Sequence, residues 1–134
     1  MNTRLLFGLA VLLMSTLAFS CEKSEAYADS PLLGYWKFDG HPATDTQAYL
    51  RVPNDEGLDV MEKSQMIELR ADGTYRVFQW SWCGTPPSYT GWYDGTWEQV
   101  SDMPLTIKLS QNGYDQLREV AEVTNDQLLL RYLY

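Results

Sequence analysis

Cys83 and His41 are the two side chains in this sequence that could combine into a thiolate–imidazole nucleophile. His41 is the only histidine, it stands far from Cys83 along the chain, and Pro42 follows it directly. No local motif around either residue supplies the further groups that a catalytic cysteine needs. We therefore expect Cys83 to be a structural thiol and His41 to be a surface residue, and we predict that the protein is not an enzyme.

Oxygen ligands for a cation are concentrated between residues 39 and 62. Their spacing does not match that of a calcium-binding EF-hand loop. The sequence also has no phosphate-binding glycine-rich loop and no set of zinc ligands. We predict a solvated acidic loop with no metal and no cofactor. Its carboxylates belong to Asp39, Asp45, Asp55, Glu56 and Asp59.

Aromatic side chains are the features that point most directly to binding. Phe78, Trp80 and Trp82 alternate along one predicted strand and therefore share a face. If that face points outward, it offers a surface for a glycan or a protein. A β-bulge near Gln79 or Ser81 would instead turn the tryptophans inward, where they would fill the core. The predicted ligand-binding residues are Trp80, Trp82, Trp92, Tyr93 and Trp97.

Short β-strands must position these side chains. Glycine, proline, asparagine and aspartate recur about every ten residues, and the apolar spacing rarely fits a helix. We predict one all-β domain over residues 32–134, an antiparallel up-and-down meander barrel of about seven or eight strands. The predicted strands are 33–38, 47–52, 65–71, 74–82, 91–100, 105–110, 116–124 and 127–133. The alternative for the second of these is a single long loop over 39–62, with Pro42 and Pro53 as breakers.

Loop lengths fix the predicted register of two hairpins. A three-residue loop at 71–73 and a two-residue loop at 125–126 each place apolar residues on one face. We expect the barrel to close by pairing its last strand with the strand at 33–38, so that no edge stays open. The predicted cross-strand pairs are Leu69–Tyr75, Glu68–Arg76, Ile67–Val77, Val123–Leu128 and Ala121–Leu130.

Residues 1–20 have the features of a secretory signal peptide. Arg4 gives the positive start, and the apolar run over 5–17 is too short to span a bilayer comfortably. The segment that ends at Cys21 resembles the cleavage box of bacterial lipoproteins, which implies a lipid on Cys21, a polar tether over 21–31 and an outer-membrane location. Without that lipid, a disulfide between Cys21 and Cys83 is the alternative.

The charge balance restricts the partners. The chain has 10 basic and 18 acidic residues, a net charge of −8, and removal of residues 1–20 takes away Arg4 alone and leaves −9. Such a charge argues against nucleic acid and against electrostatic adsorption to anionic lipid. The membrane contact that we expect is therefore the lipid anchor.

Three motifs resemble those of lipocalins and of bacterial lipocalin-like lipoproteins. They are Gly34-Tyr35-Trp36 at the first strand, Asp72-Gly73-Thr74-Tyr75, and a second Gly-x-Trp at Gly95-Thr96-Trp97. The resemblance implies a small envelope barrel, and it would give Arg131 the role of the cation that covers Trp36.

These observations favour a cell-envelope lipoprotein with a non-enzymatic binding role. The ligand is either a small apolar molecule inside the barrel or a glycan or envelope protein on the aromatic face. The alternative is a protein-interaction module, such as an accessory subunit or a periplasmic protease inhibitor that inserts residues 22–32.

Overall fold

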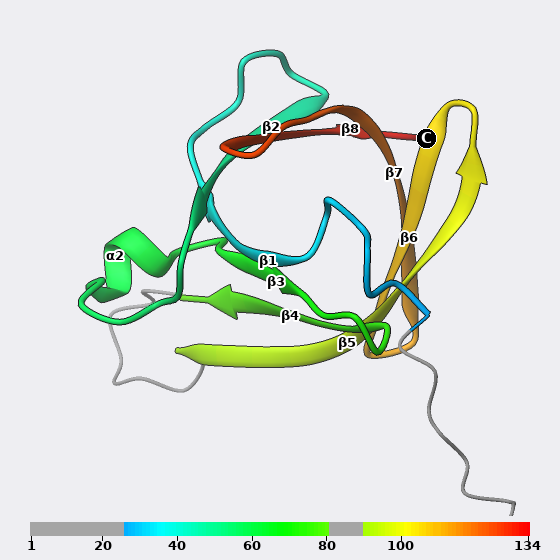
Figure 1. The fold of residues 1–134 in the computed structure, drawn as a ribbon. Coiled ribbons are helices and arrows are strands. Elements are labelled where there is room, and N and C mark those ends of the chain that lie inside the picture. The colour runs from blue at the N-terminus through cyan, green and yellow to red at the C-terminus, as the bar shows by residue number, and fades with distance from the viewer. Residues whose placement is uncertain (1–25, 81–89) are drawn as a thin grey trace, which may run out of the picture.

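A computed structural model describes residues 26–80 and 90–134, and in it the chain forms a closed, antiparallel barrel of eight strands (Figure 1). The predicted fold class is thus confirmed, and all eight strands form where the sequence places them, to within a few residues. The strands are β1 (Gly34–Phe38), β2 (Thr46–Val52), β3 (Ile67–Leu69), β4 (Thr74–Gln79), β5 (Gly91–Asp102), β6 (Leu105–Gln111), β7 (Tyr114–Val123) and β8 (Gln127–Tyr132).

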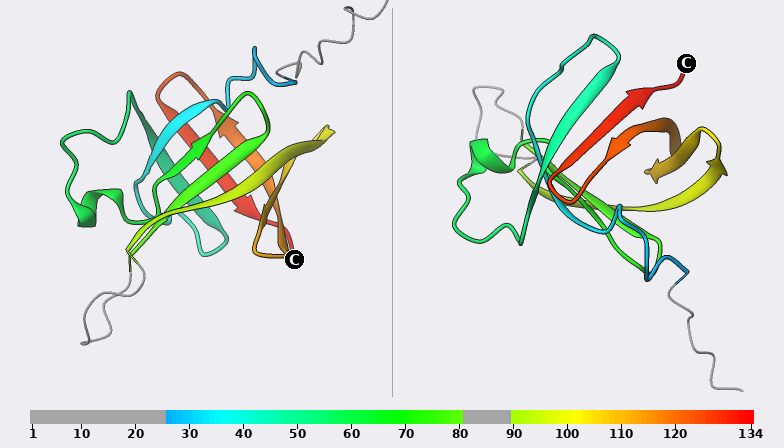
Figure 2. Two further views of the ribbon diagram at one scale, coloured as in Figure 1. Left: turned by 90° about the horizontal axis from the view of Figure 1, so that it is seen from below. Right: turned by 45° about the horizontal axis from the view of Figure 1, so that its top comes forward.

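The order of strands around the barrel departs from a simple meander at one place. From β3 to β8 each strand pairs with its neighbour in sequence, but β8 then pairs with β2, and β1 lies between β2 and β3. The expected closure of the last strand onto 33–38 is therefore wrong. Both edges of β1 are already used, because Trp36 pairs with Arg51 on one side and with Ile67 on the other. Figure 2 shows the resulting barrel from two further directions.

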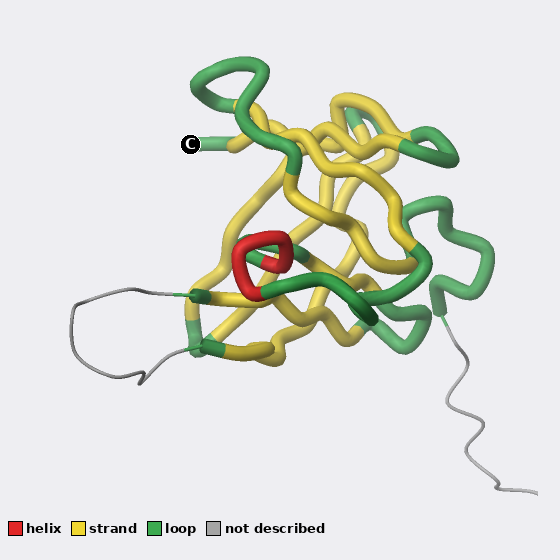
Figure 3. Tube along the Cα trace, turned by 90° about the vertical axis from the view of Figure 1, so that its left-hand side faces the viewer, coloured by secondary structure: helices red, strands yellow, loops and turns green. Residues whose placement is uncertain are grey.

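The connection from β2 to β3 carries the only helix among the described residues, α2 (Val60–Lys63). It crosses the outside of the barrel next to β1 (Figure 3). Asp59 caps this single turn by accepting from the Glu62 amide, and the Glu62 carboxylate accepts from the Asp59 amide in return. No helix was predicted here from the sequence, because four residues are too few to show a helical period.

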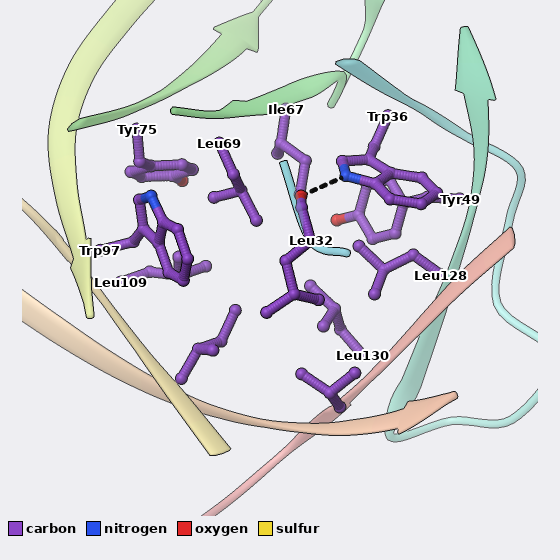
Figure 4. Close-up of a cluster of buried hydrophobic side chains, with 12 residues drawn as sticks. Leu32, Trp36, Tyr49, Ile67, Leu69, Tyr75, Trp97, Leu109, Leu128 and Leu130 are labelled. Carbon is purple, nitrogen blue, oxygen red and sulfur yellow. Dashed lines mark hydrogen bonds between the residues drawn. The ribbon is translucent and has the colours of Figure 1, made fainter. Parts of the chain in front are cut away.

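The core fills the barrel from inside with residues that alternate along the strands (Figure 4). One of its most buried side chains, Leu32, does not come from a strand but from the segment before β1. The Trp36 indole N–H donates to the Leu32 carbonyl over 2.8 Å, which joins that segment to the core. The side chains that are almost completely buried are Trp36, Leu32, Met66, Leu69, Ile107, Leu128 and Leu130.

One of the two predicted hairpin registers is confirmed throughout, and the other fails at a bulge. The pairs between β3 and β4 are those predicted, with Leu69 opposite Tyr75. Between β7 and β8, Val123 does face Leu128, but a bulge at Ala121 brings Val120 rather than Ala121 opposite Leu130. The bulge places the larger valine in the core and leaves the alanine exposed, which buries more apolar surface.

Candidate functional site

Residues 27–33, which precede β1 and are called the closing segment below, close one end of the barrel. The Tyr27 ring packs 4.2 Å from the Trp97 ring, and Leu32 is 1% exposed. Residues near the end of the predicted tether are therefore attached to the barrel.

Arg51 holds that closing segment in place. Its guanidinium donates to the carbonyl oxygens of Pro31, Leu33 and Asn125 over 2.7, 2.6 and 2.6 Å. The same group lies 4.1 Å from the centre of the Trp36 ring. The resemblance to lipocalins suggested Arg131 for this position, which is wrong. Arg131 lies on the outer face, where it pairs with Glu119 and Asp45, because its neighbour Leu130 takes the inward position.

A pocket of about 260 Å³ opens at the opposite end of the barrel. Its deep wall combines the apolar side chains of Ile67, Leu109 and Leu130 with buried polar groups. Five glutamines and three tyrosines line it, so the pocket offers hydrogen bonds from several directions. These polar residues are Gln47, Gln65, Gln79, Gln111, Gln116, Tyr49, Tyr75 and Tyr132.

Arg118 is the only charged side chain among the described residues that line this pocket. It is 7% exposed, and its guanidinium carbon lies 3.6 Å from the centre of the Tyr132 ring, directly across from it on β8. It donates to the Gln116 side-chain oxygen over 2.8 Å and, at 3.5 Å, to the Leu117 carbonyl. Burial lowers the pKa of Arg118 from its ordinary value, but an arginine stays protonated in a protein.

Two buried tyrosines stand beside this cation. Tyr49 is 3% exposed, and its hydroxyl donates to the Gln47 side-chain oxygen over 3.2 Å. The Tyr75 ring packs over Gly95, where an added Cβ would lie 3.0 Å from that ring and collide with the Ser110 carbonyl. Gly95 is the glycine of the second Gly-x-Trp motif. Because it has no Cβ, the Tyr75 ring can lie against its backbone, and Tyr75 lines the pocket from there.

The buried hydroxyls predict a loss of stability at alkaline pH. Burial raises the pKa of Tyr75 to about 12, and it also raises the pKa of Tyr49. Because these groups ionise first in the unfolded chain, their contribution to the free energy of unfolding should stay constant up to about pH 10. Between about pH 10 and 12 it should fall by about 1.4 kcal/mol per pH unit for Tyr75 alone.

Denaturant unfolding at about pH 9 and pH 11.5 measures this fall. The variant Tyr75→Phe should show a smaller fall than the unmodified chain. The variant Tyr114→Phe, at a tyrosine that is 77% exposed, should not differ from the unmodified chain. An equal fall in all three proteins would contradict the pH dependence assigned to Tyr75.

The four described residues among the aromatics predicted to bind a ligand do not come together in one surface. Trp97 is 2% exposed and belongs to the core. Tyr93 pairs with Val77 on the inner face of the barrel and is half-buried. Trp92 lies on the outer face, and Trp80 is half-buried just after β4. Trp82 lies outside the described residues, as do Cys21 and Cys83.

The outward orientation of the aromatic strand holds as far as β4 extends. Pairing of β4 with β5 runs without a shift from Thr74 to Gln79, so no bulge turns Phe78 inward. The Phe78 ring is nevertheless 6% exposed, because the connection with α2 covers it and Lys63 lies over the ring. Trp92 packs edge-on against Phe78, and its indole N–H donates to Asp55. The molecule itself thus covers part of this face.

Among the described residues, the remaining candidates for chemistry do not gather into one site. The His41 ring is at hydrogen-bonding distance from the Thr46 carbonyl, 3.2 Å away, and packs on Phe38. Within residues 26–80 and 90–134, no three histidine, cysteine, aspartate or glutamate side chains gather in a way that could hold a metal ion. In the same part of the chain, no helix is both long and apolar enough to cross a membrane.

Arg118 and the glutamines around it were not predicted as site residues from the sequence. Arg118 was placed within a predicted strand, but one charged residue does not show which face of a strand points inward. The available signal was that Gln116, Arg118 and Val120 share one face, as do Gln47 and Tyr49. Polar residues on the inward face at one end of several strands indicate a polar pocket.

Comparison with known proteins gives this chain no relative. No protein-family model, no curated protein and no solved structure matches it. Its function must therefore be argued from the geometry of the barrel and its pocket.

Proposed function

We propose that this protein binds a small polar molecule, without chemical conversion, in the open end of its barrel. The observation that carries the proposal is Arg118, an almost fully buried cation that lines a pocket accessible from outside. Burying a charge costs free energy unless a partner compensates for it, so such a group in a pocket points to a ligand. Concave sites with a few convergent polar groups are the usual form of small-molecule sites.

The proposal places the protein in the cell envelope. Its support is the signal-peptide pattern of residues 1–20 and the lipoprotein-like segment that ends at Cys21. Tyr27 packs against Trp97 at the closed end of the barrel, and the pocket lies at the opposite end. The side of the barrel from which the described residues lead back towards Cys21 is thus not the side on which the pocket opens.

A screen of the purified full-length chain against small polar metabolites tests the proposal. A ligand that binds only the folded state should raise the melting temperature, and the rise should grow with the logarithm of its concentration once that concentration exceeds Kd. Native mass spectrometry of the same mixtures should show a single added mass.

Two tryptophan substitutions in β7 locate the binding. Gln116 is exposed at the rim of the pocket, and Gln116→Trp should narrow the entrance and weaken binding. Leu117 points outward from the same strand and is 43% exposed, so Leu117→Trp should leave binding unchanged. No hit in the screen, or a hit that Gln116→Trp does not weaken, would contradict a function in this pocket.

A further inference from the structure

The cation in the pocket differs from the other arginines of the barrel in its partners. Arg70 and Arg76 pair with Glu68, and Arg131 pairs with Glu119 and Asp45. Arg51 binds three carbonyl oxygens. Arg118 alone, among the described arginines, has neither a carboxylate nor a set of carbonyl oxygens. This difference arises in a chain with a large excess of carboxylates, of which none among the described residues lines the pocket.

The guanidinium of Arg118 keeps hydrogen-bonding capacity for a ligand. It has five N–H groups, and the described residues provide two acceptors, one of them at 3.5 Å. Stacking on Tyr132 occupies the face of the group and fixes its plane, but it does not use the N–H groups at its edge. The site is thus prepared for an acceptor that brings a negative charge.

We propose that the ligand is a small monocarboxylic acid that also carries several hydroxyl groups, of the size of a single sugar acid. This assignment rests on the function proposed above and specifies its ligand. A single arginine matches the single charge and the two oxygens of a carboxylate. A phosphate ester carries more charge, and the described residues that line the pocket provide no second cation for it.

The rest of the pocket accounts for the hydroxyl groups. The glutamine amides already bond to Tyr49, Tyr93, Arg118 and one another, but each amide has two N–H groups and two lone pairs, so donors and acceptors remain for hydroxyl groups of a ligand. The volume of about 260 Å³ corresponds to about nine water molecules at about 30 Å³ each, which is enough for a molecule of the size of one sugar ring. A lining this polar would also leave many groups unpaired around an apolar ligand.

Matched pairs of acid and neutral sugar test the assignment by isothermal titration calorimetry. The probes are glucuronate against glucose and galacturonate against galactose, with glucose 6-phosphate as the phosphate probe, all on the purified full-length chain. At least one acid should bind about 10- to 100-fold more tightly than its neutral partner, the worth of a charge-assisted pair. Glucose 6-phosphate should bind more weakly than that acid.

Three arginine variants test whether the tighter binding of the acid than of the neutral sugar depends on Arg118. Arg118→Met should remove the preference for the acid while changing the affinity for the neutral sugar less than about threefold. Arg118→Lys keeps the charge but loses the fork, so it should retain part of the preference and carries the test if Arg118→Met fails to fold. Arg131→Met, on the outer face next to Tyr132 in sequence, is the matched control and should bind like the unmodified chain.

The outcomes separate this assignment from the function it rests on. Equal binding of acid and neutral sugar, or tighter binding of the phosphate, overturns the carboxylate while a small-molecule function remains. A preference that survives Arg118→Met overturns the role of Arg118. If none of the five probes binds, the assignment of a sugar acid is wrong, and the metabolite screen with Gln116→Trp decides separately whether the pocket binds any small molecule.

Discussion

Replacing Trp36 with alanine should lower the free energy of unfolding by about 3–5 kcal/mol. The Trp36 side chain is 0% exposed, and it fills the barrel where Leu32 and the closing segment meet the strands. Its removal leaves a cavity, deprives the Leu32 carbonyl of its donor and removes the ring under Arg51. Denaturant unfolding followed by circular dichroism measures the change.

Two further variants separate the contribution of the Trp36 indole N–H from that of its ring, and provide an exposed control. Trp36→Phe keeps most of the ring but loses the indole N–H, so its cost should be smaller, about 1–3 kcal/mol. Met61→Ala, at a side chain in α2 that is 64% exposed, should stay within about 0.5 kcal/mol of the unmodified chain. A cost for Trp36→Ala no larger than that of Met61→Ala would mean that this end of the core is packed differently.

Replacing Arg51 with methionine should lower the free energy of unfolding by about 2–4 kcal/mol. Methionine can still pack on Trp36, so the loss comes from the three carbonyl oxygens that the guanidinium binds. Two of these, at Pro31 and Leu33, belong to the closing segment, so hydrogen exchange at the adjacent Trp36 indole and Leu33 amide should become faster.

Arg70→Met is the matched control for Arg51→Met. Arg70 has a side chain that is 45% exposed and makes one ion pair with Glu68, and such pairs contribute about 1 kcal/mol or less. Its replacement should therefore cost much less than that of Arg51 and should not affect exchange in the closing segment. Equal costs for the two variants would show that Arg51 is an ordinary surface arginine.

The strands could be predicted because the alternation of apolar residues within a strand and the turn residues beside it are both local features of the sequence. Alternation over Leu105, Ile107 and Leu109 and the turn at Asp72-Gly73 both depend on a few adjacent residues, and β6 and the β3–β4 register follow them. The closure of the barrel depends on contacts between segments far apart in sequence. Nothing local to β8 distinguishes β2 from β1 as its partner.

The candidate site was harder to predict than the fold because aromatic residues serve both packing and binding. Trp97 was expected at a ligand site, but it forms core with Tyr27. Trp92 was expected at the same site, but it packs on the outside under Asp55 and beside Phe78. The proposed binding site instead contains Arg118. Its inward position follows from the register of β7 with β6 and β8, which the sequence of β7 alone does not show.

The most direct test of the binding site is a map of amide chemical-shift changes, by nuclear magnetic resonance, as glucuronate is added to the labelled full-length chain. The proposed function and the assignment of Arg118 together predict the largest changes at the open end, around Gln47, Gln111, Gln116, Arg118 and Tyr132. Changes centred on Trp92 and Phe78 would move the site to the outer aromatic face. No change at the open end with saturating glucuronate, nor with saturating galacturonate in a second titration, would contradict a sugar-acid site in the barrel.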